Sequence, residues 1–145
     1  MKKILFAVLL LVSVMAKSQS KTDTTAIKET VLNYIEGYYN ADWQRMTKAL
    51  HPEMAKRIII KDSLGNNMLQ NMGASTLIYY TRKAKTNNGL SPNQPFKADI
   101  IIYDIYNNVA TVKVSTNKFR FIDYIHLGKF GEEWRIVNVL WEYLK

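Results

Sequence analysis

Cysteine is absent from this 145-residue sequence. The absence excludes disulfide bonds, thiolate nucleophiles and cysteine-based metal sites. It also excludes a lipid anchor on a cysteine that follows an N-terminal apolar segment. A chain of this length can bury a hydrophobic core without cross-links, so we expect packing to hold the fold together.

Glycine is scarce, with six residues, and none of them belongs to a familiar catalytic or phosphate-binding motif. The sequence lacks Gly-x-Ser-x-Gly, which presents a nucleophilic serine, and the Gly-rich loop that cradles nucleotide phosphates. The dinucleotide-binding pattern Gly-x-Gly-x-x-Gly is also missing. These absences argue against a hydrolase, a kinase or a dehydrogenase.

Histidine is rarer still, because His51 and His126 are the only two. They do not form the His-x-His or His-x-x-x-His spacing that brings two imidazoles to one metal ion. We therefore predict no metal site and no cofactor.

Clusters of positive charge are missing, although the formal net charge is +8. Lysine and arginine are spread along the chain and never form a run of five. A nucleic-acid-binding surface gathers basic residues on one face, so we predict solvated surface residues and no nucleic-acid partner.

A long apolar run occurs only once, at residues 4–15, directly after Met1-Lys2-Lys3. A basic start, a short apolar run and small residues after it are typical of a secretory signal peptide. The run is shorter than the roughly 20 residues that a membrane-spanning helix needs, so we predict no stable membrane anchor. The alternative is that this segment forms a buried N-terminal helix.

Cleavage of the signal peptide is predicted after Ser18, with cleavage after Ala16 as the alternative. Loss of residues 1–18 would leave a single domain, residues 19–145, and would lower the formal charge to +5 because three lysines leave with it. We therefore expect an exported protein that is periplasmic or extracellular.

The first half of the chain has the pattern of three helices. An amphipathic helix is predicted over 26–40, where apolar residues recur at helical spacing, namely Ile27, Val31, Tyr34, Ile35 and Tyr38. Asp42 can cap a second, short helix, and His51-Pro52 should end it because the residue before proline disfavours helical backbone. A third helix is predicted over about 74–85.

Strands dominate the rest of the chain. They are predicted over 57–61, 67–70, 96–106, 109–117, 119–129 and 133–143. The last four are consecutive and should form an antiparallel meander, after a loop at 86–95. Helices before strands indicate an α+β domain, in which a curved antiparallel sheet carries three helices from the N-terminal half on one face. The result is a cone with a pocket between sheet and helices.

The chain closes with two runs rich in β-branched and aromatic residues that flank Phe130-Gly131-Glu132-Glu133. A short glycine-containing turn between such runs is typical of a β-hairpin. We expect the last strand to lie in the middle of the sheet.

Three segments carry a resemblance to a known family. They are residues 34–42 with the following His51-Pro52-Glu53, residues 121–127, and residues 133–138 with Trp141 and Glu142. These segments resemble nuclear transport factor 2-like domains, and most closely the branch called "putative lumazine-binding". The resemblance implies the cone-shaped, cystatin-like fold. It does not choose a function, because the superfamily holds ketosteroid-isomerase-like, polyketide-cyclase-like and scytalone-dehydratase-like enzymes as well as non-catalytic binding proteins.

Tyr34 and Tyr38 are the first candidate pocket residues. They lie one turn apart and share a helix face. Two phenols in a cavity could hold a carbonyl or enolate oxygen, and the alternative is that both are core residues with satisfied hydroxyls.

Asp123 and Tyr124 are candidates on the penultimate strand. Strand alternation sends Asp123 to one face of the sheet and Tyr124 and His126 to the other. A carboxylate facing the pocket would be a candidate general base, since burial raises its pKa toward neutrality. The alternative is a surface Asp123 paired with a lysine or an arginine.

His51, Asn138 and Trp141 complete the candidates. His51 is either a pocket-edge base or a C-cap of the second helix. Asn138 interrupts an apolar strand, so it is either a structural bridge or a ligand contact. Trp134 is expected in the core, whereas Trp141 could line the cone.

Three functions remain open at this point. The first is an exported, non-catalytic domain that binds a small hydrophobic or aromatic molecule. The second is an isomerase- or dehydratase-like enzyme, in which Asp123, Asp99 or Asp104 acts as base beside Tyr38 or His51. The third is an interaction module, a homodimer formed through the open sheet face, for which Val112, Val114, Phe119, Phe121 and Ile125 could supply apolar surface.

Overall fold

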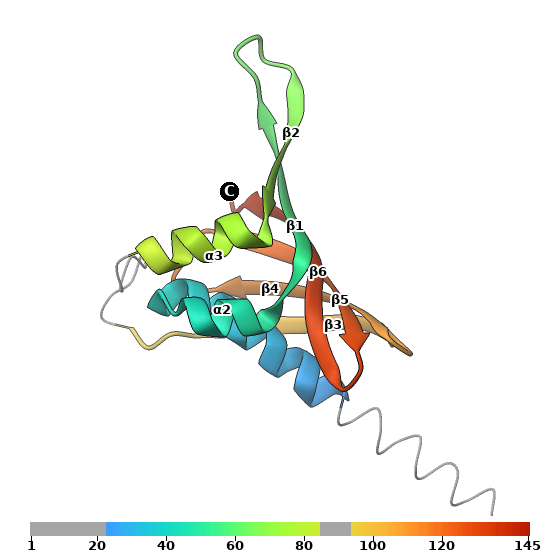
Figure 1. The fold of residues 1–145 in the computed structure, drawn as a ribbon. Helices are drawn as coiled ribbons and strands as arrows, with labels where there is room; N and C mark the ends of the chain where they lie inside the picture. Colours follow the sequence, from blue (N-terminus) through green and yellow to red (C-terminus); the bar gives the residue numbers. More distant parts are fainter. Residues whose placement is uncertain (1–22, 85–93) are drawn as a thin grey trace, which may run out of the picture.

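The computed structural model describes residues 23–84 and 94–145. Three helices cover one face of a six-stranded sheet that does not close into a barrel (Figure 1). The predicted α+β cone is confirmed. The signal peptide and most of the loop predicted at 86–95 lie outside the described residues.

The elements follow the predicted order. The first helix occupies 23–40 in the described part of the chain. The other elements are α2 (Trp43–Ala49), β1 (Leu50–Lys61), β2 (Asn67–Gly73), α3 (Ala74–Lys83), β3 (Ala98–Tyr106), β4 (Val109–Thr116), β5 (Phe121–Phe130) and β6 (Glu133–Tyr143).

The sheet order is β2-β1-β6-β5-β4-β3. Strands β3 to β6 form the predicted antiparallel meander, and β6, the last strand, lies inside the sheet between β1 and β5. The expectation of a fully antiparallel sheet is wrong at one place, because β1 and β6 run parallel. The chain between them runs through β2, α3, β3, β4 and β5, which provides the long crossover that a parallel pair needs.

Strand β1 begins earlier than predicted and changes the role of His51. Asp42 caps α2 as expected, since its side chain accepts hydrogen bonds from the backbone N–H groups of Gln44 and Arg45. The helix ends at Ala49 and Leu50 is its C-cap, so the proposed C-cap role of His51 is wrong. The chain passes directly into β1, and its pairing with β6 is irregular between Leu50 and Ala55, where Pro52 cannot donate a ladder hydrogen bond.

The core lies between the helices and the inner face of the sheet. Ile27, Val31 and Ile35 of the first helix are fully buried, as the helical spacing predicted. Trp134 of β6 is 3% exposed, and Thr30 donates a hydrogen bond to its backbone carbonyl. This hydrogen bond links the first helix to the closing hairpin of β5 and β6.

A β-bulge in β6 sets which side chains enter the cone. Leu127 of β5 pairs with Ile136 of β6, whereas the preceding residue, His126, pairs with Asn138, so Val137 has no partner on β5. One residue of β6 is thus unpaired, and the inward parity changes there. Trp134 and Ile136 point inward before the bulge, whereas Val139 and Trp141 point inward after it, and Asn138 turns to the outer face of the sheet.

The apolar residues suggested for an outer interface lie inside instead. Val112, Val114 and Ile125 are fully buried in the core, while Phe119 and Phe121 border the cavity described below. Strand alternation places Val112, Val114, Phe121 and Ile125 on the inner face of the curved sheet, and Phe119 lies just before β5.

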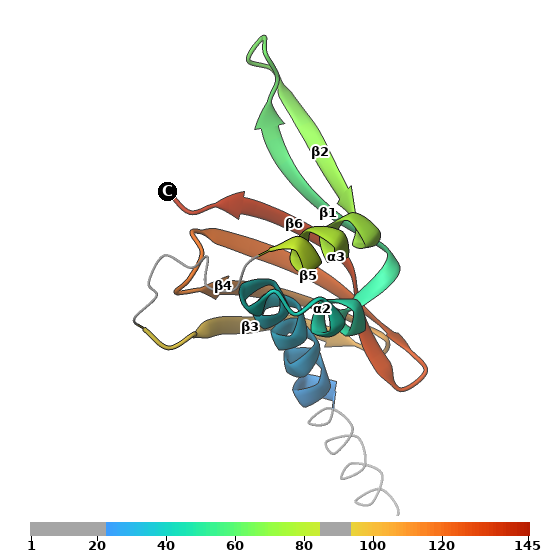
Figure 2. The same cartoon turned by 60° about the vertical axis from the view of Figure 1, so that its left-hand side comes forward.

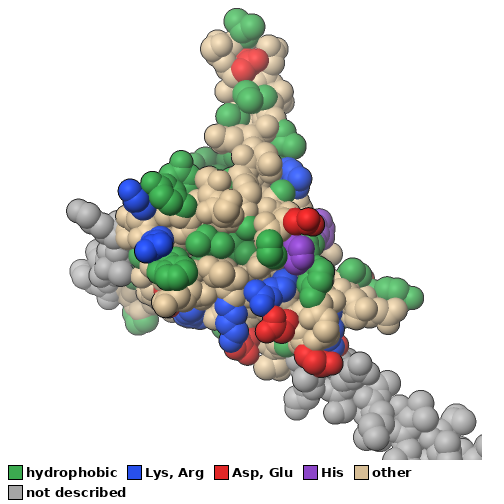
Figure 3. Space-filling view, in the orientation of Figure 1, with side chains coloured by type: hydrophobic (Ala, Val, Ile, Leu, Met, Phe, Trp, Pro, Cys, Tyr) green, Lys and Arg blue, Asp and Glu red, His purple; other side chains and the backbone are tan. Residues whose placement is uncertain are grey.

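The hairpin of β1 and β2 projects beyond the body of the domain (Figures 1, 2 and 3). Its turn is closed by Asp62, whose carboxylate accepts hydrogen bonds from the backbone N–H groups of Leu64 and Asn66. Gly65 adopts a φ of 85°, which only glycine takes without strain. The base of this hairpin forms one side of the cavity.

Candidate functional site

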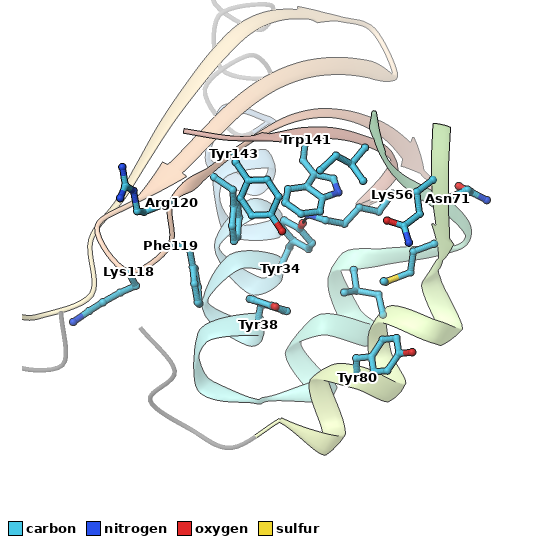
Figure 4. A pocket seen from close by; sticks show the side chains of 15 residues that line it. Tyr34, Tyr38, Lys56, Asn71, Tyr80, Lys118, Phe119, Arg120, Trp141 and Tyr143 are labelled. Atoms are coloured by element: carbon cyan, nitrogen blue, oxygen red, sulfur yellow. Dashed lines mark hydrogen bonds between the residues drawn. The ribbon is translucent and has the colours of Figure 1, made fainter. Parts of the chain in front are cut away.

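A cavity of about 630 Å³ opens between the sheet and the helices. This volume lies in the range of small-molecule sites. Figure 4 shows side chains from the first helix, α3, both strands of the β1–β2 hairpin, residues 118–121 and β6 converging on it. It is lined by Tyr34, Tyr38, Lys56, Ile58, Gln70, Asn71, Met72, Leu77, Tyr80, Lys118, Phe119, Arg120, Phe121, Trp141 and Tyr143.

Aromatic rings make most of the wall. Phe119 and Phe121 lie parallel with ring centroids 5.2 Å apart, and Trp141 meets Phe121 edge to face at 5.7 Å. Tyr38 closes the helix side at 5.2 Å from Phe119. These mutual contacts hold the rings in place, so the wall is formed before any ligand arrives.

A buried polar cluster forms the floor. The Nζ atom of Lys56 donates to Asp123 Oδ1 at 2.9 Å and to the Tyr34 hydroxyl at 2.5 Å. Tyr34 in turn donates its proton to Asp123 Oδ2 at 2.8 Å. Asp123 is completely buried and the Lys56 side chain is 11% exposed. The carboxylate therefore has a protein partner on each oxygen.

The ammonium group of Lys56 is also surrounded by rings. Its Nζ atom lies 5.3 Å from the ring centroid of Tyr34, 5.3 Å from Phe121 and 5.0 Å from Trp141. The π faces attract the charge and compensate in part for lost water. Among the described charged residues at the cavity, only Lys56 takes part both in an ion pair and in contacts with the aromatic wall.

Burial controls the titration of this cluster. Desolvation lowers the pKa of Lys56, and the neighbouring Asp123 opposes the shift. Desolvation also raises the pKa of Tyr34 well above its ordinary value, and the negative charge of Asp123 adds to the effect. Desolvation likewise raises the pKa of Tyr38, and electrostatic interactions with Tyr143 and Asp123 add to the rise. Both phenols are neutral hydrogen-bonding groups near pH 7.

The two other cationic residues at the cavity do not aim into it. Figure 4 shows the side chains of Lys118 and Arg120 directed away from the aromatic wall. The Lys118 ammonium donates to the backbone carbonyl of Gln94. Apart from the polar floor and the exposed amides of Gln70 and Asn71 on β2, the lining is thus mostly aromatic and apolar.

The structure brings three of the candidate residues together at this cavity. Tyr34, Tyr38 and Trp141 line it, and Asp123 lies directly behind its floor. Tyr34 is 2% exposed and Tyr38 is 38% exposed, so the first belongs to the floor and the second to the mouth.

Tyr124 and Asn138 lie on the opposite face of the sheet. Tyr124 stacks on Tyr103 with a centroid distance of 6.5 Å. The Asn138 amide accepts a hydrogen bond from Arg57 and contacts the His126 ring at 3.1 Å. Asn138 is therefore a structural bridge, as one of the two alternatives proposed, and it does not reach the cavity because of the bulge.

His51 borders a second, shallower hollow at the other end of the sheet. Its ring stacks on Phe130 at 4.5 Å, and its Nδ1 atom accepts the backbone N–H of Glu53. It is remote from the aromatic wall, since it does not line the large cavity.

The base that an enzyme of the isomerase type would need is not free. Asp123 contacts Tyr34 and Lys56 and reaches neither Tyr38 nor His51 in the described structure. Asp99 and Asp104 lie exposed on the edge strand β3. A carboxylate positioned to abstract a proton inside the cavity is therefore missing among the described residues.

Lys56 is the charged site residue that sequence reasoning missed, beside Phe119 and Phe121, which it had assigned to an outer interface. It lies between Met54 and Ile58, two apolar residues at alternate positions of β1, which is the pattern of an inward-facing strand position. The signal was hidden because the strand was predicted to begin at residue 57. Extending the alternation back to Met54 would have placed a lysine on the inner face.

Comparison with known families identifies the chain. The model of the family described as "putative lumazine-binding" matches residues 22–142. The chain belongs to this family. The match covers the described residues up to Glu142, so every lining residue of the cavity except Tyr143 lies within it.

Solved structures confirm the fold. A nuclear transport factor 2-like protein of unknown function from Shewanella baltica OS155 has a TM-score of 0.67 at 24% identity, covering 85% of this chain and 94% of the other. One from Silicibacter pomeroyi DSS-3 gives 0.66 at 13% identity, with 86% and 98% covered. One from Methylobacillus flagellatus KT gives 0.63 at 22%, with 85% and 93% covered. At these identities the likeness concerns the fold alone.

No curated protein matches the chain. Among the residues that the structure describes, no helix is long and apolar enough to cross a membrane.

Proposed function

We propose that this protein binds a small, largely apolar aromatic molecule in the cavity and does not transform it. The observation that carries the proposal is the preformed aromatic wall of Phe119, Phe121 and Trp141 around a volume of about 630 Å³. Sites for small molecules are concave, mostly apolar and supplied with a few convergent polar groups. The family description points in the same direction.

The engagement of Asp123 supports binding without catalysis. A general base must be able to reach the proton that it removes. Both oxygens of Asp123 are occupied by Lys56 and Tyr34, and the side chain is fully buried. The isomerase- or dehydratase-like alternative would need this cluster to open.

Export is the second part of the proposal. It is supported by the basic start and the apolar run at residues 4–15. N-terminal mass spectrometry of the protein from its native host should find a terminus near Gln19 outside the cytoplasm. An intact Met1 on cytosolic protein would contradict it.

An exposed row across the outer sheet face supports a homodimer as a second candidate role. The cross-strand pairing aligns Ile101, Lys113, Tyr124, Leu140 and Arg57 on five strands. Tyr124 is 42% and Leu140 is 43% exposed, so apolar surface is available beside charged groups. Sedimentation velocity should give a dimer that Tyr124→Lys weakens, and a concentration-independent monomer would rule out this role.

The binding proposal is tested with an uncharged fluorescent probe, N-phenyl-1-naphthylamine. Its emission should rise on binding to the purified protein. Met72→Trp, which fills the cavity from β2, should abolish the rise, whereas Met68→Trp should not, because Met68 lies on the same strand outside the cavity and is 46% exposed. Equal behaviour of the two variants would contradict the site. A thermal-shift panel of flavin-like, pterin-like and steroid-like compounds then narrows the ligand class.

A further inference from the structure

The floor of the cavity has a hydrogen-bond donor to spare. An ammonium group carries three N–H donors and no acceptor. Lys56 uses one on Asp123 Oδ1 and one on the Tyr34 hydroxyl. The third has no acceptor within the described residues, and Lys56 lines the cavity. A bound molecule with an acceptor atom would complete the set.

The Tyr34 hydroxyl and the Asp123 carboxylate are already engaged with one another. Tyr34 donates to Asp123 Oδ2 and accepts from Lys56. The cluster therefore presents a donor to the cavity more readily than an acceptor. An oxygen acceptor on the ligand matches this floor. A ligand hydroxyl or amine proton meets only the Tyr34 oxygen, which already accepts from Lys56, because Asp123 is fully buried and does not line the cavity.

The charge of the ligand follows from the position of Asp123. A cationic group would be repelled by Lys56 at close range. An anionic group would be attracted by Lys56 but repelled by the carboxylate only 2.9 Å behind it, and would lose its water on entry. Lys118 and Arg120 offer little compensation, because their side chains point away (Figure 4). An uncharged acceptor avoids these costs.

The rings restrict the shape of the ligand. Phe119 and Phe121 are parallel, and Trp141 stands nearly perpendicular to Phe121 at an interplanar angle of 73°. Flat aromatic ligands can stack on one surface and meet the other edge to face. A planar molecule whose acceptor projects from the ring edge can reach Lys56 while its rings contact this wall.

We infer that the cavity selects planar, uncharged aromatic molecules that carry a ring-edge carbonyl, with the carbonyl oxygen accepting the third N–H of Lys56. This inference rests on the proposed binding function. It adds the chemical class of the ligand and the residue that reads it.

The test uses three naphthalenes of nearly equal size, in titration calorimetry or by displacement of N-phenyl-1-naphthylamine. They are 2-acetylnaphthalene, 2-ethylnaphthalene and 2-naphthoate. The ketone should bind about tenfold more tightly than the ethyl compound, the usual scale of one well-placed hydrogen bond to a charged donor. The carboxylate should bind more weakly than the ketone.

A double variant, Lys56→Met with Asp123→Asn, removes the donor without leaving a lone buried charge. It should bind the ketone and the ethyl compound equally. Lys113→Met, a lysine of the outer sheet face, should keep the wild-type preference. Because the wild-type comparison of the three compounds needs no variant, a misfolded variant does not decide the result.

Equal binding of the ketone and the ethyl compound, tightest binding of the carboxylate, or binding of none of the three would overturn the inference. The binding proposal has its own test, because N-phenyl-1-naphthylamine carries no carbonyl. Probe binding that Met72→Trp blocks, together with no preference for the ketone, would leave the cavity as a site and remove the role of Lys56.

Discussion

Lys56 and Asp123 form an ion pair across an intervening strand of the sheet. Lys56 lies on β1 and Asp123 on β5, and β6 runs between the two strands in the sheet. Their side chains meet above it at 2.9 Å, with Tyr34 of the first helix as third member. One polar cluster thus ties the first helix to β1 and β5, the two strands on either side of β6.

Breaking this pair should be costly, and removing both charges should cost less than the two single changes together. Lys56→Met leaves the buried Asp123 carboxylate without its cation, and the loss of unfolding free energy should be roughly 3–5 kcal/mol. The double variant with Asp123→Asn should be destabilised by less than the sum of the two single losses, because neither member of the ion pair remains as an unpaired buried charge. Urea unfolding of the four proteins gives the coupling, and strict additivity would contradict the cluster.

Trp134→Ala should destabilise the domain by about 3–5 kcal/mol, since it empties a large aromatic site in the core. Trp134 is 3% exposed and its Nε1 atom donates to Asp23. Trp43→Ala is the matched control, because Trp43 is 37% exposed and should lose far less. Thermal and urea unfolding measure both, and similar losses for the two tryptophans would contradict the assigned packing.

Acid should remove the contribution of Asp23. The hydrogen bond from Lys129 is the largest influence on its carboxyl and lowers the pKa below the ordinary 3.8, with Trp134 assisting. A depressed folded-state pKa gives stability that is present above the unfolded value and is lost as pH falls through the folded one. Asp23→Asn should therefore destabilise the protein at pH 6, and the difference from wild type should shrink below about pH 4. A difference that stays constant with pH would contradict this role.

Substitutions at two residues of β6 should differ in their effect on ligand binding in the cavity. Trp141→Ala should weaken binding of N-phenyl-1-naphthylamine several-fold, because a wall of the site is removed. Asn138→Ala should leave binding nearly unchanged, since Asn138 bridges Arg57 and His126 on the outer face. Fluorescence titration compares the two, and a larger effect of Asn138 would mean that the inner face of β6 is assigned wrongly.

Sequence periodicity predicted the fold well because it records burial. The helical spacing of Ile27, Val31 and Ile35 and the alternation of β4 to β6 report which faces avoid water, and these residues are buried as expected. The closing hairpin was recognisable from its glycine turn at Gly131, which has a φ of 64°. Pairing between distant strands leaves no such local mark, so the parallel contact of β1 with β6 was not predicted.

The site was harder to predict than the fold because its polar groups come from distant segments. Tyr34 and Tyr38 were found through their shared helix face, and Asp123 through strand alternation. Lys56 was missed because the start of β1 was placed after it, and Asn138 was assigned without knowledge of the bulge. A bulge depends on the pairing partner, which the sequence of one strand does not disclose.

The bulge also separates two roles of β6. It divides β6 into a proximal part, where Trp134 and Ile136 complete the core, and a distal part, where Trp141 and Tyr143 face the cavity. Substitutions at Trp141 or Tyr143 can alter the lining of the cavity while Trp134, Ile136 and Val139 of the core stay unchanged. The shape of the cavity and the packing of the core thereby depend on different side chains of one strand.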